Sequence, residues 1–345
     1  MKKKSYRRQN VPLARLYGKL LVLTLPFLPL IAIYFIVDPD MILRKYQRFD
    51  QSEVFLNEGY VGWQNYLNNR DSIPFNSFIV GNSCTMAFYT EEWEKYLSDD
   101  SKAVRFFENG ESFAGVCQKL KALDENHAKI DNLLVVLDTK AFSVTVPSQE
   151  TNRIFSYESA GISHGQFILR NLQAFLMPQK CFPFLSYKIT GKFSPNMKKV
   201  IVENGPIREP YTNNFLNPRE REIERDGELY WTRHRDEFHK KERCPGQTDS
   251  QVIFKNQRKL MQELKDICSK HSTNLTLIIG PDFYQKRMHQ KDLEQLQEVF
   301  GYKNVFDFTG VNAFTEDYHH YYEPGHYRPV LGAKLLKNIY NISQI

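Results

Sequence analysis

The chain has 345 residues, of which 41% are hydrophobic and 25% are charged, so it is neither a disordered, a fibrous nor a polytopic membrane protein. This length suffices for two average domains or for one large α/β domain with insertions. The 46 Lys and Arg and the 40 Asp and Glu give a net charge of +6, but residues 1–19 alone hold seven cations and no acid. The other 39 cations balance the 40 acids, which excludes a basic nucleic-acid-binding domain.

An apolar run of eighteen residues follows this basic tail, at 20–37. As a helix rising about 1.5 Å per residue, the run would just cross a hydrocarbon core of about 30 Å, and Pro26 and Pro29 are tolerated in membrane helices. A cleaved signal peptide has a similar pattern, but no small-residue cleavage site follows. We therefore expect one uncleaved transmembrane helix. Because cations stay in the cytoplasm, residues 1–19 are predicted to be a cytoplasmic tail and 38–345 to face the periplasm or exterior of a bacterial inner membrane.

Short apolar strands alternate with helices beyond a predicted stem at 38–73. In chain order we expect a strand at 78–80, a helix around Trp93, a strand at 104–107, a helix at 113–127, a strand at 133–137, a helix at 251–270, a strand at 275–279, a helix at 288–300, a strand at 304–306 and a last helix at 328–342. Fully apolar strands such as LLVVL at 133–137 are typical of parallel sheets buried on both faces. The alternation predicts an α/β domain over 74–345 with a doubly wound parallel sheet.

Residues 142–250 interrupt this alternation, because they contain no comparably strong strand, and 218–245 is dense in charge. One interpretation is a solvated insertion on the surface. The other is a lid or arm that carries Trp231 and several arginines over an active site, toward an acyl donor or a glycan. The sequence leaves both open.

No pattern for a metal or a cofactor occurs. The cysteines are odd in number and lack CxxC spacing, which argues against a thiol zinc site and permits at most two disulfides of unknown pairing. The histidines form no ligand pattern, and neither a P-loop nor a GxGxxG motif is present. We expect no metal and no cofactor. The cysteines are Cys84, Cys117, Cys181, Cys244 and Cys268.

Ser83 is a candidate nucleophile because it ends a Gly-Asn-Ser turn between the first strand and its helix. In doubly wound sheets, ligands bind at the carboxyl ends of the strands, near the point where the strand order reverses. A serine there exposes its hydroxyl, and backbone N–H groups at the helix start can stabilise an oxyanion. Gly-Asn-Ser is also an ordinary turn sequence.

A serine nucleophile needs a base, and the base needs an acid that orients it. Glu323 and His326 stand three residues apart before the last helix, with Gly325 between them to allow a tight fold. A rival Asp-x-x-His pair, Asp317 and His320, lies six residues earlier and therefore further from that helix.

The order of these parts resembles the SGNH (GDSL-like) hydrolases. In that family an early Gly-x-Ser supplies the nucleophile, and a late Asp-x-x-His supplies the acid and the base before the last helix, a block that HYRPVLGAKLL here resembles. The resemblance implies a flavodoxin-like three-layer sandwich, a catalytic triad of Ser83, Glu323 and His326, and an oxyanion hole from Ser83 and Gly110. Two departures stand out: Glu323 replaces the usual Asp, and Asp138-Thr139 stands where the family has Gly-x-Asn-Asp.

A single anchor before an outward SGNH-like domain is similar to the partners of membrane-bound O-acyltransferases in D-alanine transfer, alginate acetylation and peptidoglycan acetylation. The resemblance implies transfer of an acyl group, in the first instance acetyl, to hydroxyls of a cell-surface glycan through an acyl-serine on Ser83. The implied partners are a membrane-bound O-acyltransferase, the glycan, and the lipid bilayer through residues 20–37, but no nucleic acid. An esterase that deacylates polysaccharide and a non-catalytic carbohydrate-binding protein are the alternatives.

Overall fold

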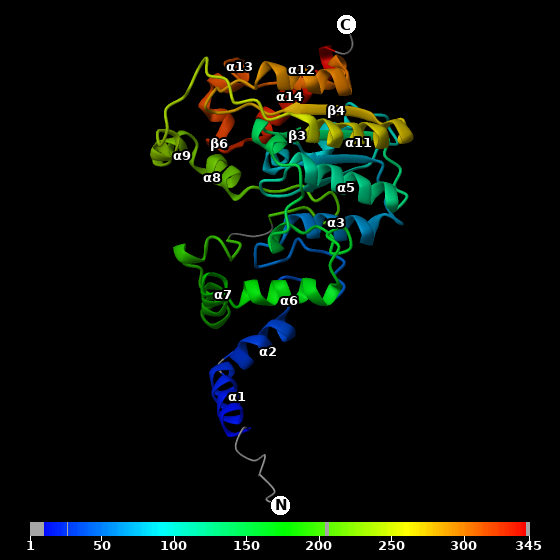
Figure 1. Cartoon of the computed structure of the whole chain (residues 1–345). Coiled ribbons are helices and arrows are strands. Elements are labelled where there is room, and N and C mark those ends of the chain that lie inside the picture. Colours follow the sequence, from blue (N-terminus) through cyan, green and yellow to red (C-terminus); the bar gives the residue numbers. More distant parts are fainter. Residues whose placement is uncertain (1–9, 26, 204–206, 343–345) are drawn as a thin grey trace, which may run out of the picture.

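Two helices lead into the rest of the chain in the computed structural model, which describes residues 10–25, 27–203 and 207–342. They are α1 (Asn10–Thr24) and α2 (Phe27–Val37) (Figure 1). Among the described residues no single helix has the length and hydropathy to cross a membrane, whereas Arg15–Thr24 and α2 have both as a pair bent by 49°. The structure thus divides the predicted span at 20–37 between two helices, and its crossing of a membrane stays a prediction.

Five parallel strands form the central sheet, as the sequence predicts. They lie in the order β2-β1-β3-β4-β5, so that β1 is flanked by β2 on one side and β3 on the other. The chain therefore reverses its winding direction at β1 and β3, and the carboxyl ends of these two strands border a crevice. The strands are β1 (Ser77–Gly81), β2 (Ala103–Phe107), β3 (Asn132–Leu137), β4 (Asn274–Ile279) and β5 (Val305–Asp307).

Helices cover both faces of the sheet, which confirms the α/β architecture. Alternate strand residues point to opposite faces, so that Phe78 and Val80 enter one buried cluster and Ile79 enters the other. The first face carries α3 (Glu58–Asn69), α5 (Phe113–Glu125), α11 (Lys255–His271) and α12 (Gln290–Phe300). The second face carries α4 (Thr90–Glu94) and α14 (Pro329–Ile342).

The predicted stem at 38–73 is not a separate connector. Helix α3 falls inside it, and its Trp63 and Tyr66 are buried in the cluster on the first face of the sheet. Residues before position 74 therefore contribute to the core of the sheet domain. The helix begins at the N-cap Asn57, whose side chain accepts a hydrogen bond from the Tyr60 N–H at 3.0 Å.

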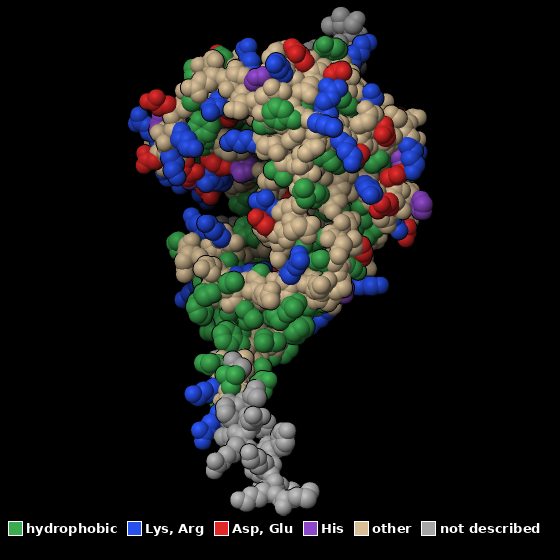
Figure 2. Space-filling view, viewed as in Figure 1, with side chains coloured by type: hydrophobic (Ala, Val, Ile, Leu, Met, Phe, Trp, Pro, Cys, Tyr) green, Lys and Arg blue, Asp and Glu red, His purple; other side chains and the backbone are tan. Residues whose placement is uncertain are grey.

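The described residues of 142–250 contribute no strand to the sheet and contain helices in two groups. The first group, α6 (His164–Phe175) and α7 (Pro178–Thr190), lies between the sheet domain and α2 (Figure 1). Tyr34 of α2 is fully buried there, with its ring centroid 5.3 Å from that of Phe175. Hydrophobic side chains gather on the surface of this part of the molecule (Figure 2).

The second group is α8 (Pro218–Asp226), α9 (Glu228–Arg233) and α10 (Arg235–Phe238), which lies beside the last part of the chain (Figure 1). Its Tyr230 and Trp231 are buried in the same cluster as α14. The last part of the chain contains α13 (Ala313–Glu316) and a hairpin of β6 (Tyr321–Glu323) and β7 (His326–Tyr327).

Candidate active site

Ser83 stands at the carboxyl end of β1, as the first residue of a 3₁₀ helix that runs from Ser83 to Ala87. Asn82 caps this helix, because its Oδ1 accepts from the Cys84 N–H at 3.0 Å and its Nδ2 donates to Asp138 at the end of β3 at 3.0 Å. Gly81 permits the turn: its φ is +149°, and a Cβ there would lie 1.9 Å from the carbonyl oxygen of Val136. The turn is thereby fixed to both strands at the point of reversal.

The β6–β7 hairpin brings the predicted base and acid to this serine. His326 Nε2 lies 2.8 Å from Ser83 Oγ, and His326 Nδ1 hydrogen-bonds Glu323 Oε1. The His326 side chain is 34% exposed and that of Glu323 is 23% exposed, so the hydrogen-bonded chain is partly open to solvent. The structure therefore joins Ser83, His326 and Glu323 in the order that a triad requires.

Arg219 extends this chain of contacts, and the sequence did not point to it. Its guanidinium donates to Glu323 Oε2 at 2.8 Å and to Glu237 at 3.0 Å. Arg219 lies in the first turn of α8, which Asn217 caps by accepting from the Arg219 N–H at 3.0 Å. Asn217 before Pro218 is a recognisable N-cap pattern, so the start of this helix could be predicted. Arg219 could not be singled out, because it is one of many arginines in a charged segment.

The charged segment 218–233 also forms hydrogen bonds to the backbone of the β6–β7 hairpin. Tyr230 Oη donates to the Tyr322 carbonyl at 2.9 Å, and Trp231 Nε1 donates to the Tyr321 carbonyl at 3.2 Å. Arg328, just after the hairpin, pairs with Glu220 of α8. Residues 218–233 are therefore a wall of the site rather than a wholly solvated insertion.

The rival pair does not reach Ser83. His320 is buried, and its ring nitrogens contact the Phe314 carbonyl at 3.0 Å and Lys334 Nζ at 2.8 Å. Burial lowers the pKa of His320. Asp317 lies 2.8 Å from His319 and 3.9 Å from His320.

Of the two predicted oxyanion-hole residues, only Ser83 is in place at the site in the structure. No residue that the structure describes accepts a hydrogen bond from the Ser83 N–H, which leaves it free for a ligand oxygen. Gly110 adopts a positive φ of +67° and lies against Arg153, and no described interaction joins it to Ser83. The role of Gly110 stays a prediction. The Asp138 carboxylate is occupied as an acceptor from Asn82 Nδ2 and from the Ala141 N–H.

Cys84 does not compete with Ser83 as a nucleophile. Burial, reinforced by nearby Asp138, raises the pKa of its thiol well above the ordinary value, so the thiol stays protonated. All five cysteines are free thiols.

A cavity of about 700 Å³ is lined by Cys84, the residue after Ser83, on one side and by Pro324 and Gly325 of the hairpin on the other. The remaining walls combine the rings of Tyr284, Tyr321 and Tyr327 with polar side chains: Asp138, Thr139, Lys140, Lys241, Glu242, Asp249, Asp282, Lys286 and Thr309. Within the described residues, no group of three or more His, Cys, Asp or Glu side chains is arranged to hold a metal ion.

Comparisons with protein-family models, with curated proteins and with solved structures gave no significant match. The chemistry of the site is therefore inferred from its geometry.

Proposed function

We propose that this protein transfers acyl groups through a covalent ester on Ser83. The observation that carries the proposal is the unbroken chain of hydrogen bonds from Ser83 through His326 to Glu323. A serine hydroxyl is a weak nucleophile until a base removes its proton, and an imidazole oriented by a carboxylate is such a base.

The proposed reaction has two halves. Ser83 Oγ attacks the acyl carbonyl carbon while His326 Nε2 takes the hydroxyl proton, and the oxyanion so formed receives the Ser83 N–H. His326 then returns the proton to the departing oxygen or sulfur, which leaves an acyl-serine. In the second half His326 takes a proton from an acceptor hydroxyl, the acceptor oxygen attacks the ester carbon, and the proton returns to Ser83 Oγ. Glu323 stays ionised throughout and stabilises the imidazolium.

We propose a glycan hydroxyl as the acceptor and acetyl as the acyl group. The cavity beside Cys84 supports a glycan acceptor, since its volume of about 700 Å³ lies in the range of ligand pockets and its walls combine tyrosine rings with charged and hydroxyl side chains. An esterase that uses water is the second candidate, because His326 is 34% exposed and water can reach it.

The same proposal places the protein with the SGNH hydrolases and beside a membrane-bound O-acyltransferase, which would supply the acyl group. The strand order and the placement of Ser83 after β1 support the first part. Membrane attachment is supported by apolar side chains that α1 and α2 expose, and by exposed Phe182 and Ile189 on the neighbouring α7.

The full-length protein in detergent, with nitrophenyl acetate as donor and an added oligosaccharide as acceptor, tests this function. Nitrophenol release and acetylated oligosaccharide are expected for the wild type, and both should vanish in Ser83→Ala. Ser269→Ala, on the surface of α11, is the matched control and should behave as wild type. Release that persists in Ser83→Ala at an unchanged melting temperature removes Ser83 from the mechanism. Release without acetylated acceptor favours the esterase, and binding without any release favours a non-catalytic glycan-binding role.

A further inference from the structure

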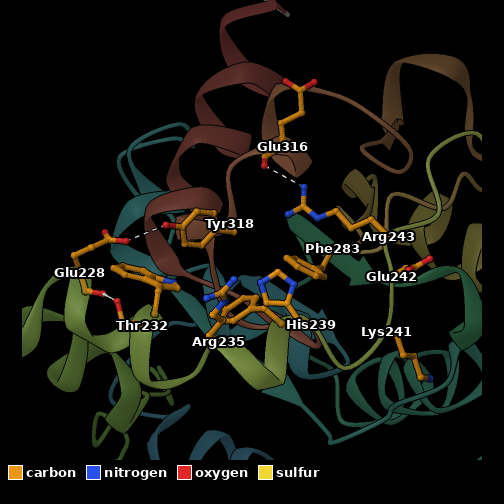
Figure 3. A pocket seen from close by; sticks show the side chains of 12 residues that line it. Glu228, Thr232, Arg235, His239, Lys241, Glu242, Arg243, Phe283, Glu316 and Tyr318 are labelled. Carbon is orange, nitrogen blue, oxygen red and sulfur yellow. Dashed lines mark hydrogen bonds between the residues drawn. The ribbon is translucent and has the colours of Figure 1, made fainter.

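A second cavity, of about 610 Å³, lies between helices α9 and α10 and the loop that follows β4 (Figure 3). Its walls combine aromatic, basic and acidic side chains, the acidic ones being Glu228, Glu242 and Glu316. Aromatic rings come from Trp231, Phe238, Phe283 and Tyr318, and basic groups come from Arg235, His239, Lys241 and Arg243.

The aromatic wall is fixed by packing. Phe238 lies edge-on to Phe283 with ring centroids 5.4 Å apart, and it contacts Tyr318 at 6.3 Å in the same geometry. Phe238, Phe283 and Trp231 are buried in the cluster that also holds α14. These rings are therefore a rigid surface rather than mobile side chains.

Within the described residues none of the four basic side chains forms an ion pair, and the carboxylates of Glu242 and Glu316 also line the cavity. Among the described residues, the side chains of Arg235 and His239 have no hydrogen-bond or ion-pair partner, and Figure 3 shows both beside the cavity. Arg243 stacks over Phe283 at 4.3 Å and donates to the Glu316 carbonyl rather than to a carboxylate. Glu228 is occupied, because it accepts from Tyr318 at 2.9 Å and contacts His319 at 3.0 Å.

Aromatic rings beside the unpaired guanidinium of Arg235 suit one kind of ligand: a ring with apolar C–H faces that also carries an anion. Guanidinium groups bind carboxylate and phosphate in a bidentate manner, and the rings supply apolar contact area. Sugars that carry a carboxylate or a phosphate combine both features.

This cavity continues toward the nucleophile. Lys241 and Glu242 line it and also line the cavity beside Ser83. A chain of sugars that fills the first cavity can therefore extend along these two residues to the second.

We propose that the cavity of Trp231, Phe238 and Arg235 is a binding subsite for an anionic glycan. Its role in acyl transfer rests on the proposed function, whereas the binding itself does not. The subsite selects the acceptor chain by charge and presents a neighbouring sugar to Ser83.

Titration calorimetry on the full-length protein in detergent tests the subsite with three probes: tetragalacturonate, an oligomer of glycerol phosphate, and neutral cellotetraose. We expect one or both anionic probes to bind and the neutral probe to bind at least tenfold more weakly. Which anionic probe binds tells a carboxylate from a phosphate ligand. Arg235→Glu should weaken anion binding at least tenfold. Lys259→Glu, with the same charge change on α11 at the opposite face of the sheet, should leave it unchanged.

Equal binding of neutral and anionic probes, no binding of any probe, or an equal loss in Arg235→Glu and Lys259→Glu would overturn the subsite. Ser83→Ala should bind the anionic probe as wild type does. Binding without acyl-serine formation leaves the subsite standing and removes the acyl-transfer function. Acyl-serine formation without charge-selective binding leaves the acyl-transfer function standing and removes the subsite.

Discussion

Ser83 gains a base only because a hairpin 240 residues later in the chain returns to the end of β1. Its Oγ lies 2.8 Å from His326 Nε2, and the other ring nitrogen of His326 contacts Glu323. Glutamate has one methylene more than aspartate, and in this hairpin the longer side chain still reaches the imidazole. The replacement of Asp by Glu is therefore compatible with a working triad.

Arg219 is expected to act as a positioning residue for Glu323. Its guanidinium holds the second carboxylate oxygen at 2.8 Å, so Arg219→Gln frees that oxygen and removes a cation that disfavours the imidazolium. A charge-assisted hydrogen bond contributes roughly 1.5–3 kcal/mol, so kcat should fall about tenfold or more, and the acidic limb of the pH–rate profile should move to higher pH.

Arg219→Lys should restore part of the rate, because it restores the charge. The matched control is Arg225→Gln on the same helix, where the exposed arginine pairs with Asp226. A purely structural role for Arg219 predicts loss of folded protein with no shift in the pH–rate profile, and that result would contradict the assignment.

The sequence pattern predicted that Glu323 and His326 lie beside Ser83, but it did not predict the residues around them. Spacing to the last helix favoured His326 over His320, and the structure joins His326 and not His320 to Ser83. Arg219 was not predicted, because its role depends on a tertiary contact with Glu323, about a hundred residues later in the chain. No local pattern encodes that distance.

The strands and long helices were predictable because their apolar patterns are local. The expected strands at 78–80, 104–107, 133–137 and 275–279 each lie within the observed strand, and the last helix is misplaced by one residue at its start. Helix α3 was missed, because its residues Asn57 to Asn69 are rich in glycine, asparagine and tyrosine rather than in aliphatic residues. Its burial comes from Trp63 and Tyr66.

We expect the free energy of unfolding to depend on pH through Glu108, which is buried between β2 and α3. Glu108 follows β2, is 2% exposed, and directs Oε2 at Gly59 of α3, where no described group bonds to it. Burial raises the pKa of Glu108 to about 8, against about 4.3 in an unfolded chain. Between these values the unfolded state holds fewer protons than the folded state, so stability is full below about pH 4 and falls as the pH rises toward 8.

Thermal melts of wild type and Glu108→Gln from pH 5 to 8 measure this effect. Wild type should lose stability relative to the variant as the pH rises, by a few kcal/mol in total, on the order of 1.4 kcal/mol per pH unit at most. The amide of the Glu108→Gln variant changes stability by the same amount at every pH, so the informative quantity is the slope of stability against pH. Parallel stability–pH curves for the two proteins would show that Glu108 is not a buried neutral acid.

At the scale of the whole molecule, the N-terminal helices and the α6–α7 pair form one end and the active site lies in the sheet domain at the other (Figures 1 and 2). The apolar run was evident from the sequence. Its packing against α6 and α7 was not, because that packing depends on contacts such as the one between Tyr34 and Phe175.

The orientation proposed for the chain predicts the outcome of proteolysis. Protease added outside intact spheroplasts should digest the region from residue 38 onward, while the segment before it stays in the membrane fraction. A cytoplasmic marker protein should survive as the control. Protection of the large domain, or its recovery as a soluble protein, would refute the orientation.

Acylation of Ser83 is the most direct test of the central claim. Wild type, His326→Ala, His320→Ala and Ser83→Ala, at equal folded concentration, are exposed to nitrophenyl acetate, quenched in acid and mapped by peptide mass spectrometry. Loss of a triad base costs a rate factor on the order of 10⁴. We therefore expect acetyl-Ser83 in wild type and in His320→Ala, and none in His326→Ala. Acetyl on another residue in the wild type, or acetyl-Ser83 that depends on His320 and not on His326, would contradict the triad.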